Sequence, residues 1–447
     1  MRTSSYTIFA QIPRSEEQIL VHGYTGAIDI VSQRLISNLK EENFGALTPK
    51  EIEVLSKRGY ITTKSKEEEY KRVELLARLF HKKASRFHLF MFLVSYDCNF
   101  RCPYCFESSI SAAGENWSGE TFTKILVDAA YEVVDKINFT SPWKSRIILY
   151  GGEPLLVKNS NIVHYIVDSG LKRGYKFGAI TNGYEVDSYQ DIIGKDAVNF
   201  LQISLDGGSI VHNNRRRHYT GEGTFYKIFE NISLALELGA FVNVRINIDE
   251  KNISQLFDLV KFIFSNKFNE RSNFQCYISV VRNYNGNVSS ENISVCSNGL
   301  CEIFPTVSKR KVLKFLESFF QIHPEFSFIQ GPDYWLKSEI KHVIQSRGAL
   351  QFRGSFCGVT GGNQIFDPRG DIYTCWGDVG KRSVRIGRFW PALSYVKEQL
   401  QEWKERTITN LSICSKCKYA LFCGGGAAHW QKQSITHLST HFVMNIH

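Results

Sequence analysis

Three cysteines stand close together at Cys98, Cys102 and Cys105, directly after an apolar, strand-like run over residues 88–94. Thiolates are soft ligands that select iron–sulfur clusters or zinc. Three thiolates are one ligand short of a closed structural metal site. A [4Fe–4S] cluster held by these cysteines would therefore keep one iron open for a small molecule that receives an electron. The simpler alternatives are a structural zinc knuckle and three buried thiols.

A second motif, Gly151-Gly152-Glu153-Pro154, ends another strand-like run further along the chain. Glycine has no Cβ, so its backbone can approach a ligand closely. A carboxylate such as Glu153 accepts hydrogen bonds from an ammonium group. By itself the motif indicates only a turn, but its place at a strand end after the cysteine triplet points to a ligand site.

Together these two motifs resemble those of the radical S-adenosylmethionine (radical SAM) enzymes. The resemblance implies that the three cysteines bind a [4Fe–4S] cluster whose open iron takes the amino and carboxylate groups of SAM. One electron then cleaves SAM to a 5′-deoxyadenosyl radical. The resemblance also implies cofactor contacts from residues at strand ends, where the alternative for the polar ones is a helix cap or loop role. These residues are Tyr104, Gly151, Gly152, Glu153, Asn182, Ser204, Asp206 and Arg245.

Strand-like and helix-like segments alternate through the middle of the chain, which predicts parallel β/α units. Every motif residue falls at the C-terminal end of a strand, where β/α barrels build their active sites. We therefore predict an α/β fold with a partial (β/α)6 TIM-like barrel. The expected strands cover residues 88–95, 145–150, 176–181, 199–205, 241–248 and 275–281, and the expected helices include 119–137, 159–171, 225–238 and 253–264.

A second group of cysteines lies near the C-terminus, with the spacings C-x12-G-x4-C and C-x2-C-x5-C. The pattern resembles the SPASM domain of radical SAM enzymes that modify peptides and proteins. It implies one or two auxiliary [4Fe–4S] clusters, and residues 363–375 are expected to form a β-hairpin around Pro-Arg-Gly-Asp. A zinc ribbon is the alternative for part of the set. The candidate metal ligands here are Cys357, Cys375, Cys414, Cys417 and Cys423.

The C-terminal pattern departs from the SPASM domain at two places. Ala427 stands where a cysteine is usual, and the last cysteine of the family pattern has no counterpart. An imidazole completes some iron–sulfur centres, and His441 is the best placed histidine by spacing. Cys296 and Cys301 are possible substitutes for the missing thiolates of the other auxiliary cluster. Cys276 belongs to a predicted strand and is expected in the core.

The N-terminal residues carry a different pattern. Runs over residues 6–12 and 18–22 indicate a β-hairpin, and segments 31–39 and 49–58 indicate short helices, with Thr48 as an N-cap. A wing strand over 59–62 and a linker helix over 64–79 complete the order. This order resembles the winged-helix elements that bind leader peptides in ribosomal peptide natural-product (RiPP) pathways. An extension that caps the barrel is the alternative.

Length and composition agree with a globular protein of two or three domains. The chain has 447 residues, 43% hydrophobic and 22% charged, with a net charge of 54 − 44 = +10. The predicted regions are a winged-helix-like region with its linker (1–85), a radical SAM barrel (86–325) and a SPASM-like region (326–447). No signal-peptide core or membrane-length run is apparent, which predicts a cytoplasmic protein whose eleven cysteines are reduced. Neither a membrane nor a nucleic acid is an expected partner, since no single-strand binding platform is evident.

These patterns predict a radical SAM maturase that forms a thioether, a carbon–carbon crosslink or a related oxidation in a precursor peptide. An electron donor such as flavodoxin or ferredoxin is implied. One alternative is an anaerobic sulfatase-maturating, formylglycine-generating enzyme. Its relatives carry a base, Asp, directly after the counterpart of Cys375, where this chain has Trp376; Asp378 is the remaining candidate for a catalytic residue. The other alternative is a non-catalytic iron–sulfur protein that binds a peptide.

Overall fold

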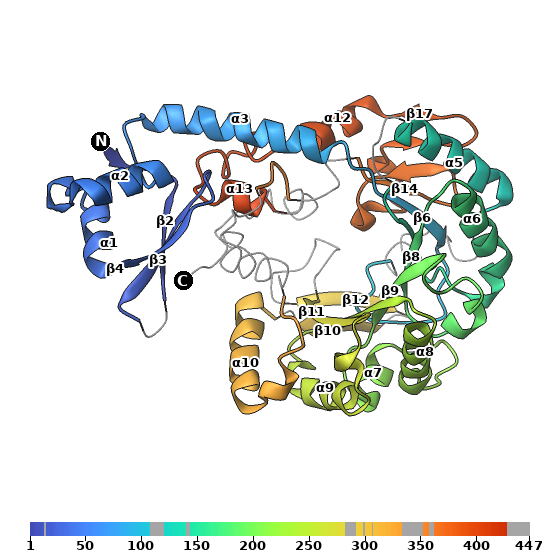
Figure 1. Cartoon of the computed structure of the whole chain (residues 1–447). Helices are drawn as coiled ribbons and strands as arrows, with labels where there is room; N and C mark the ends of the chain where they lie inside the picture. Colours follow the sequence, from blue (N-terminus) through green and yellow to red (C-terminus); the bar gives the residue numbers. More distant parts are fainter. Residues whose placement is uncertain are drawn as a thin grey trace. The chain divides into compact units, whose positions relative to one another are not determined.

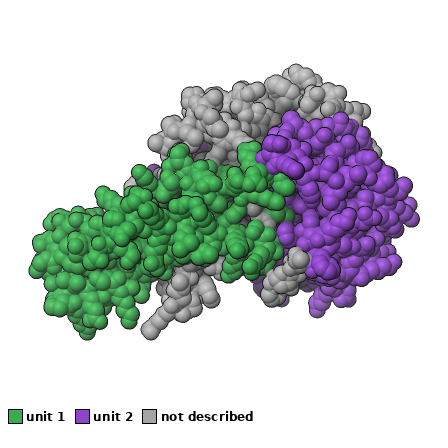
Figure 2. Space-filling model, turned by 90° about the horizontal axis from the view of Figure 1, so that it is seen from above, with its two compact units in different colours: residues 1–87, 335–362, 400–447 green, residues 88–334, 363–399 purple. Residues whose placement is uncertain are grey.

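The computed structural model describes residues 1–12, 15–107, 120–139, 144–281, 292–297, 300–305, 307–332, 352–356 and 362–426, with the backbone alone at 292–297 and 300–305. The chain forms two compact units (Figure 2). Unit 1 comprises residues 1–87, 335–362 and 400–447, and unit 2 comprises residues 88–334 and 363–399. The C-terminal region predicted over 326–447 thus contributes to both units. The three predicted regions stay a prediction.

Unit 2 is built on six parallel strands, which confirms the predicted partial barrel (Figure 1). Their order in the sheet follows their order in the chain, as expected for successive right-handed β/α units. The strands are β6 (Phe90–Ser95), β7 (Ile147–Gly151), β8 (Phe177–Thr181), β9 (Val198–Ser204), β10 (Phe241–Ile248) and β11 (Phe274–Val280). The helices between them are α5 (Lys124–Asn138), α6 (Ser160–Lys172), α7 (Ser209–Arg215), α8 (Phe225–Glu237) and α9 (Leu256–Ser265).

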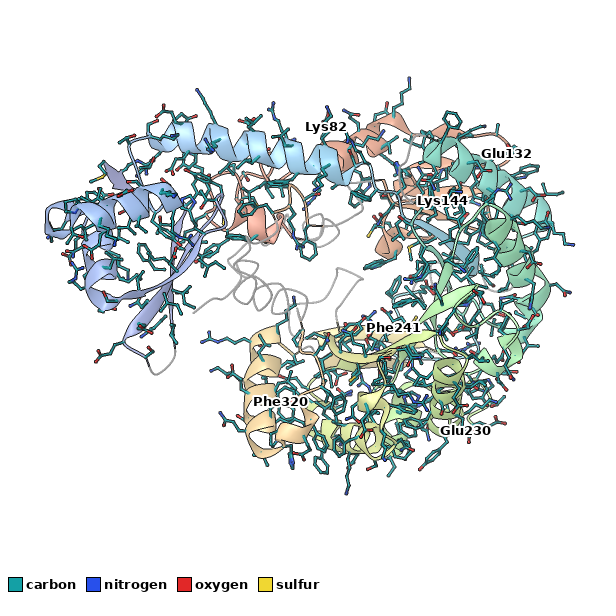
Figure 3. All side chains as sticks on the ribbon, viewed as in Figure 1. Lys82, Glu132, Lys144, Glu230, Phe241 and Phe320 are labelled. Carbon is teal, nitrogen blue, oxygen red and sulfur yellow. The ribbon has the colours of Figure 1, made fainter. Side chains whose placement is uncertain are left out.

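The helices of unit 2 cover the sheet with apolar faces and leave charged faces outside. Figure 3 shows Glu132 on α5 and Glu230 on α8 pointing away from the strands, and both are exposed. A helix that is apolar on one side and charged on the other packs its apolar side against the core. Helix α7 was not predicted, because its seven residues are too short for a clear helical period.

The two faces of β10 differ in polarity. Val242, Val244 and Ile246 are completely buried on one face, whereas Asn243, Arg245 and Asn247 on the other face are polar. Successive side chains of a strand point to opposite faces of its sheet. The polar face of β10 therefore supplies side chains to the inside of the barrel, and the apolar face supplies the core.

A hairpin from beyond the barrel extends the sheet. Strand β14 (Gln364–Phe366) pairs parallel with β6, and β15 (Asp371–Tyr373) pairs antiparallel with β14, so the predicted hairpin is confirmed. Strands β16 (Gly387–Arg388) and β17 (Ser394–Tyr395) complete a ten-stranded sheet in the described part of the chain. Ile365 and Tyr373 pack with Met91 and Leu93 in one apolar cluster. Burial of that cluster explains why the hairpin belongs to unit 2.

The N-terminal part of unit 1 is a three-stranded antiparallel sheet followed by helices. The strands are β2 (Thr7–Gln11), β3 (Glu17–His22) and β4 (Ile28–Ser32), in the order β2-β3-β4. The helices are α1 (Gln33–Lys40), α2 (Pro49–Arg58) and α3 (Lys66–Ala84), and the short strands β1 (Arg2–Thr3) and β5 (Ile61–Thr62) pair with each other. We call residues 1–87 the N-terminal module.

Two N-terminal helix predictions are wrong in their bounds, and one of them, the linker helix expected over 64–79, runs over Lys66–Ala84. The helix expected over 31–39 begins only at Gln33, because Val31 and Ser32 end strand β4. The β-branched residues of β4 favour an extended backbone, and pairing with β3 stabilises it. The N-cap prediction at Thr48 is confirmed: its side chain accepts from the backbone N–H of Glu51, whose carboxylate accepts from the Thr48 N–H in a capping box.

The C-terminal part of unit 1 packs against the N-terminal module. Helix α13 (Ala420–Cys423) contributes Ala420 and Leu421 to a cluster that also contains Val73 and Ala77 of α3. The Arg353 N–H donates to the Leu421 carbonyl at 2.9 Å. These contacts place the segment with the last three cysteines beside α3, in the same unit as the N-terminal sheet.

The remaining described α-helices and strands are α10 (Lys309–Ile322), α12 (Lys397–Glu405) and a hairpin of β12 (Asn292–Ser297) and β13 (Leu300–Pro305). Within the residues that the structure describes, no helix is both long and apolar enough to cross a membrane.

Candidate functional site

The three cysteines of the first motif lie in one loop, directly after β6. Cys98, Cys102 and Cys105 are half-buried and form no disulfide. The Phe100 N–H donates to the Cys98 sulfur at 3.3 Å, and the Cys105 N–H donates to the Cys102 carbonyl at 3.1 Å in a tight turn. The loop thus wraps around its own thiols and already provides an amide donor to one sulfur.

The donor set fits an iron–sulfur cluster. Burial raises the pKa of the Cys98 and Cys102 thiols, and a bound cation offsets such a shift because it stabilises thiolate. Across the described residues, no three His, Cys, Asp or Glu side chains converge on a point that suits a single metal ion. A cluster does not require such convergence, because each thiolate binds a different iron. Amide donors to the sulfurs are a further feature of cluster sites.

The glycines of the Gly-Gly-Glu-Pro motif are required by backbone packing. The Gly152 N–H donates to the Ser95 carbonyl at 2.9 Å, and the Glu153 N–H donates to the Asp97 carbonyl at 2.8 Å. A methyl group on Gly151 would overlap the Ser95 carbonyl, and one on Gly152 would lie 2.6 Å from the Tyr96 oxygen. The end of β7 therefore fits directly against the cysteine loop, a reason for glycine that the sequence argument missed.

Glu153 connects this motif to the end of β8. Its side chain is buried, with 1% exposed, and burial raises the pKa of its carboxyl to about 7. The carboxylate accepts from the Thr181 hydroxyl at 2.6 Å, the Asn182 N–H at 2.6 Å and the Leu155 N–H at 2.9 Å. These bonds hold the Thr-Asn-Gly turn after β8 in place.

Asn182 lies beside the first cysteine. Its amide nitrogen is 4.0 Å from the Cys98 sulfur and donates to the Asn99 side-chain oxygen at 2.6 Å. Asn99 in turn donates to Glu185 at 3.1 Å. Asn99 was not among the predicted site residues, although its place inside the cysteine motif was a signal. Asn99 thus holds the Asn182 amide beside the Cys98 sulfur.

Tyr104 and Asp206 meet in a buried charged network. The Tyr104 hydroxyl donates to Asp206, and the Asn247 amide donates to the other Asp206 oxygen at 3.0 Å. Arg215 lies 3.4 Å from Asp206, and Arg216 donates to the Tyr104 hydroxyl at 2.9 Å. Burial alone would raise the pKa of Asp206, but the two guanidinium groups outweigh burial and lower it. Asp206 therefore stays ionised and fixes the Tyr104 ring.

The two buried arginines were missed as site residues. The sequence shows them only as part of a short basic run, Arg215-Arg216-Arg217-His218. Burial separates their roles, because Arg215 and Arg216 are each 7% exposed whereas Arg217 is exposed. Two adjacent buried guanidinium groups require buried carboxylates, a condition that Asp206 and Asp249 meet at 3.4 Å and 2.7 Å from Arg215.

Ser204 and Arg245 are register partners at the ends of β9 and β10. Both side chains are half-buried. The Arg245 Nε is buried and has no hydrogen-bond partner among the described residues. A buried guanidinium nitrogen without an acceptor is costly, so the site suits an anionic group of a ligand, as predicted for the SAM carboxylate.

The other predicted metal ligands fall in both units. Cys375 follows β15 in unit 2, and Asp378, which is 8% exposed, donates its N–H to the Cys375 carbonyl at 3.0 Å. Cys414, Cys417 and Cys423 lie in unit 1, where burial raises the pKa of the Cys414 thiol to about 11. Cys276 is buried in β11, as expected. Cys357, Ala427 and His441, and the side chains of Cys296 and Cys301, lie outside the described residues.

A family model of the Radical SAM superfamily matches residues 92–263. The chain carries a radical SAM domain. This domain contains the cysteine triplet, the Gly-Gly-Glu-Pro motif and the strand ends with Asn182, Ser204 and Arg245. Enzymes of this superfamily use a [4Fe–4S] cluster and SAM, in agreement with the donor set described above.

Curated relatives match within the same domain. GTP 3′,8-cyclase from Vibrio vulnificus is 28% identical over 171 residues, 38% of this chain and 46% of that protein. A cysteine-type anaerobic sulfatase-maturating enzyme from Clostridium novyi is 25% identical over 177 residues, again 38% of this chain and 46% of that protein. The chain thus spans about half the length of the curated relatives it matches.

Two solved structures share the fold more widely. The structure of anSMEcpe with bound AdoMet and Cp18Cys peptide matches with a TM-score of 0.54 and 16% identity, over 76% of this chain and 89% of that one. Streptococcus suis SuiB bound to precursor peptide SuiA also matches with a TM-score of 0.54, at 14% identity, over 97% of this chain and 96% of that one. These likenesses concern the fold.

Proposed function

We propose that this chain is a radical SAM enzyme that modifies a ribosomally made precursor peptide, forming a thioether, a carbon–carbon crosslink or a related oxidation. The observation that carries the proposal is the fold shared with SuiB, a structure that contains a precursor peptide, over 97% of this chain. Because so little is left out, the shared fold extends over the N-terminal module as well as the barrel. The peptide bound in the anSMEcpe structure gives further support.

In this proposal the barrel residues divide into ligands and positioning groups. Cys98, Cys102 and Cys105 hold the [4Fe–4S] cluster, which when bound supplies the electron that cleaves SAM. The Arg245 Nε, which has no partner in the part of the chain that the structure describes, donates to the SAM carboxylate. Glu153 already accepts three hydrogen bonds from its own chain, so it positions the turn after β8.

Asp206 is a positioning residue by the same reasoning. One of its oxygens accepts from Asn247, and the other accepts from Tyr104 and lies beside Arg215. The contacts described for Asp206 thus engage both oxygens, and its role is to keep the Tyr104 ring fixed next to the third cysteine. A fixed aromatic ring at that place suits the adenine of SAM, in line with the predicted contact.

The N-terminal module is proposed to hold the leader segment of the precursor. The sheet order β2-β3-β4 makes β2 and β4 edge strands. An extended peptide that adds to a sheet edge gains main-chain hydrogen bonds, while side-chain pockets set specificity. Ile30 on β4 is 62% exposed and offers an apolar contact to such a peptide. Binding away from the barrel would let several core positions reach the site in turn.

The test uses short peptides encoded beside the gene, reconstituted enzyme, SAM and a chemical reductant. We expect 5′-deoxyadenosine together with a peptide whose mass is lower by two hydrogens for each crosslink. The variant with alanine at all three cysteines of the barrel loop should form neither product. If that variant still cleaves SAM, the assignment of the cluster ligands is wrong.

Peptide capture is tested by fluorescence anisotropy with Ile30→Lys. We expect affinity to fall about tenfold, which corresponds to about 1.4 kcal/mol, while SAM cleavage without peptide is unchanged. Val54→Lys is the matched control, since Val54 is a 47% exposed apolar residue on α2. Equal affinity of Ile30→Lys and wild type for the peptide would exclude the β4 edge as its binding site. Deletion of residues 1–80 should also weaken peptide binding. This deletion removes Val73 and Ala77 from a core shared with α13, so it changes packing as well as binding.

Sulfatase maturation is the second candidate, and the 25% identity to a cysteine-type anaerobic sulfatase-maturating enzyme over 177 residues favours it. Trp376 directly follows Cys375 where those enzymes carry aspartate, which weighs against formylglycine chemistry. Asp378, two residues later, is the base to test in that case. A sulfatase-derived cysteine peptide incubated with enzyme and SAM should remain unmodified; formylglycine, lost in Asp378→Asn, would favour this candidate. A non-catalytic peptide-binding protein would bind peptide and leave SAM intact.

A further inference from the structure

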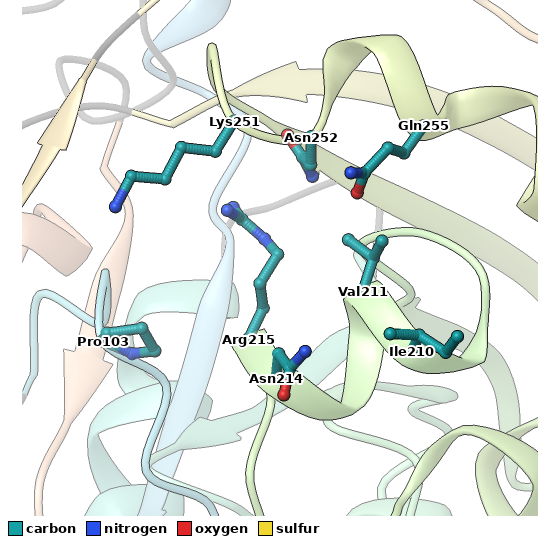
Figure 4. A pocket seen from close by; sticks show the side chains of 8 residues that line it. All are labelled: Pro103, Ile210, Val211, Asn214, Arg215, Lys251, Asn252 and Gln255. Atoms are coloured by element: carbon teal, nitrogen blue, oxygen red, sulfur yellow. The ribbon is translucent and has the colours of Figure 1, made fainter.

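The hydroxyl of Tyr6 is a buried hydrogen-bond donor that lies outside the radical SAM site. Arg245 Nε and Arg215 Nη2 also lack a partner in the described part of the chain, but both belong to the barrel. Figure 4 shows Arg215 in the wall of a pocket of about 300 Å³ that Pro103 of the cysteine loop also lines. Tyr6 belongs to unit 1, directly before β2, and is 1% exposed. Its hydroxyl has no hydrogen-bond partner among the described residues.

The buried carboxylate of Glu69 does not serve as the acceptor for Tyr6. Tyr24, whose ring packs edge-on against Tyr6 at 5.4 Å, donates its hydroxyl to Glu69 Oε1 at 3.1 Å. Oε1 also accepts from the Ser4 hydroxyl, and Oε2 accepts from the Ser5 N–H at 3.0 Å. A buried donor without an acceptor costs about 1–3 kcal/mol, and nearly all such groups in native proteins have a partner. The partner of the Tyr6 hydroxyl must therefore be another group.

The thiols of the C-terminal segment are neighbours of Tyr6. Cys414 and Cys417 pack against the apolar cluster that contains Tyr6. A methyl group added to Gly23 would lie 2.3 Å from the Lys418 carbonyl oxygen and 3.2 Å from the Tyr6 Cβ. The chain directly after Cys417 therefore runs beside the Tyr6 side chain. Burial raises the pKa of the Tyr6 hydroxyl, and Cys417 is one of the ionisable neighbours that raise it further. These contacts make the Cys417 sulfur the candidate acceptor.

The three cysteines of this segment fit an iron–sulfur cluster. The Cys417 N–H donates to the Cys414 carbonyl at 3.0 Å in a tight turn. After Cys423, three successive glycines have φ values of 71°, 87° and 74°, a left-handed backbone that favours glycine. This turn leads back to Cys414, since a methyl group added to Gly425 would lie 3.8 Å from the Cys414 sulfur. Thiolates are the ligands of such clusters, and they accept charge-assisted hydrogen bonds.

We propose that the Tyr6 hydroxyl donates a hydrogen bond to the Cys417 thiolate of the auxiliary cluster and makes this cluster easier to reduce. The inference goes beyond the proposed function and rests on the auxiliary cluster that the cysteine pattern implies. Net charge and hydrogen bonds to the sulfurs set the potential of a cluster. Reduction adds one negative charge, so a donor to a ligand sulfur stabilises the reduced form more than the oxidised form. The N-terminal module thus contributes a donor to the auxiliary centre.

The test measures the reduction potential of the auxiliary cluster by a redox titration followed by electron paramagnetic resonance. The background is the full-length chain with alanine at Cys375 and at the three cysteines of the barrel loop. Any cluster in this protein is then held by the last three cysteines. We expect Tyr6→Phe to disfavour reduction about tenfold, a shift of about 59 mV to lower potential for one electron. The iron content should stay at about four per chain.

Tyr24→Phe is the matched control, because it removes a hydroxyl from the ring beside Tyr6 whose partner is Glu69. This variant should leave the potential unchanged. Stability of the iron-free protein separates the hydrogen bond from packing. Without the cluster, Tyr6→Phe removes a donor that has no described acceptor and should not lower the free energy of unfolding, whereas Tyr24→Phe should lower it.

Three results would overturn the proposal. They are an unchanged potential in Tyr6→Phe, an equal shift in Tyr24→Phe, and the absence of iron from the background protein. None of them bears on the proposed function, which is tested separately by SAM cleavage and peptide modification with wild-type enzyme. A failure of the proposed function and a failure of this inference are therefore distinguishable.

Discussion

Replacement of Glu153 by glutamine tests whether this carboxylate positions the SAM site. The wild-type side chain uses one oxygen for Thr181 and Leu155 and the other for the Asn182 N–H at 2.6 Å. Glutamine has a single acceptor oxygen, so an orientation that keeps the first two bonds turns its NH2 group toward the Asn182 N–H. Two donors then face each other in a site where Glu153 is 1% exposed.

The loss of one acceptor at residue 153 sets the expected free-energy cost of Glu153→Gln. One buried donor without an acceptor costs about 1–3 kcal/mol. If Asn182 moved away from the glutamine NH2 group, it would lose its hydrogen bond to Asn99 and its contact with Cys98. If this cost reduces the free energy of SAM binding, the affinity for SAM falls by about 5- to 150-fold, at 1.4 kcal/mol per tenfold. We expect the rate of 5′-deoxyadenosine formation at low SAM concentration to fall in parallel.

The assay is SAM binding by equilibrium dialysis under anaerobic conditions, combined with chemical denaturation. Thr181→Ser is the matched control, because serine keeps the hydroxyl that donates to Glu153 and should bind SAM as wild type does. Wild-type SAM affinity and an unchanged free energy of unfolding in Glu153→Gln would refute the reasoning. A loss of stability with wild-type SAM affinity would limit the residue to local scaffolding.

Three further predictions concern packing and pH. Gly152→Ala should push the Asp97 carbonyl away and loosen the cysteine loop, so reconstituted protein should hold about four irons fewer per chain. Gly23→Ala places a methyl group against the Lys418 carbonyl and should lower the free energy of unfolding by about 1–3 kcal/mol in chemical denaturation. Asp367→Asn should make stability less sensitive to pH, because burial raises the pKa of Asp367 from 3.8 to about 7. The neutral carboxyl stabilises the fold fully below pH 4, and this contribution is lost as pH rises to 7, so wild type should lose about 3 kcal/mol relative to the variant between pH 5 and 8.

Each of these has a simple contrary outcome. Full iron content in Gly152→Ala would show that the loop tolerates the methyl group. Gly45→Ala is the control for Gly23→Ala, because only the Asn43 side chain, at 3.9 Å, lies near an added methyl group there. A stability difference between wild type and Asp367→Asn that is constant with pH would show that the carboxyl does not titrate in this range.

Local patterns predicted much of the barrel because they report local geometry. The apolar alternation of β10 gave its bounds, 241–248, and the capping residue Thr48 gave the start of α2. Strand β4 was missed because its five residues run directly into a helix. Only pairing with β3 makes these residues a strand and not the first turn of that helix. Likewise the hairpin of β14 and β15 was predicted, but its place beside β6 was not, since that pairing joins residues far apart in the chain.

The same division holds for the candidate site. The sequence alone determined the radical SAM resemblance and a set of candidate cofactor ligands, through the cysteine spacing and the motifs at strand ends. This was possible because ligand types and their spacing are local properties. The tertiary structure decided that Glu153 is engaged by Thr181 and Asn182, and that Arg215 is buried between two carboxylates with one nitrogen that has no partner among the described residues. It also decided that the N-terminal module and the last three cysteines share one unit. These contacts depend on which distant segments of the chain bury surface against each other. Hydrogen bonds in a buried site form only after the folded chain has brought donor and acceptor together.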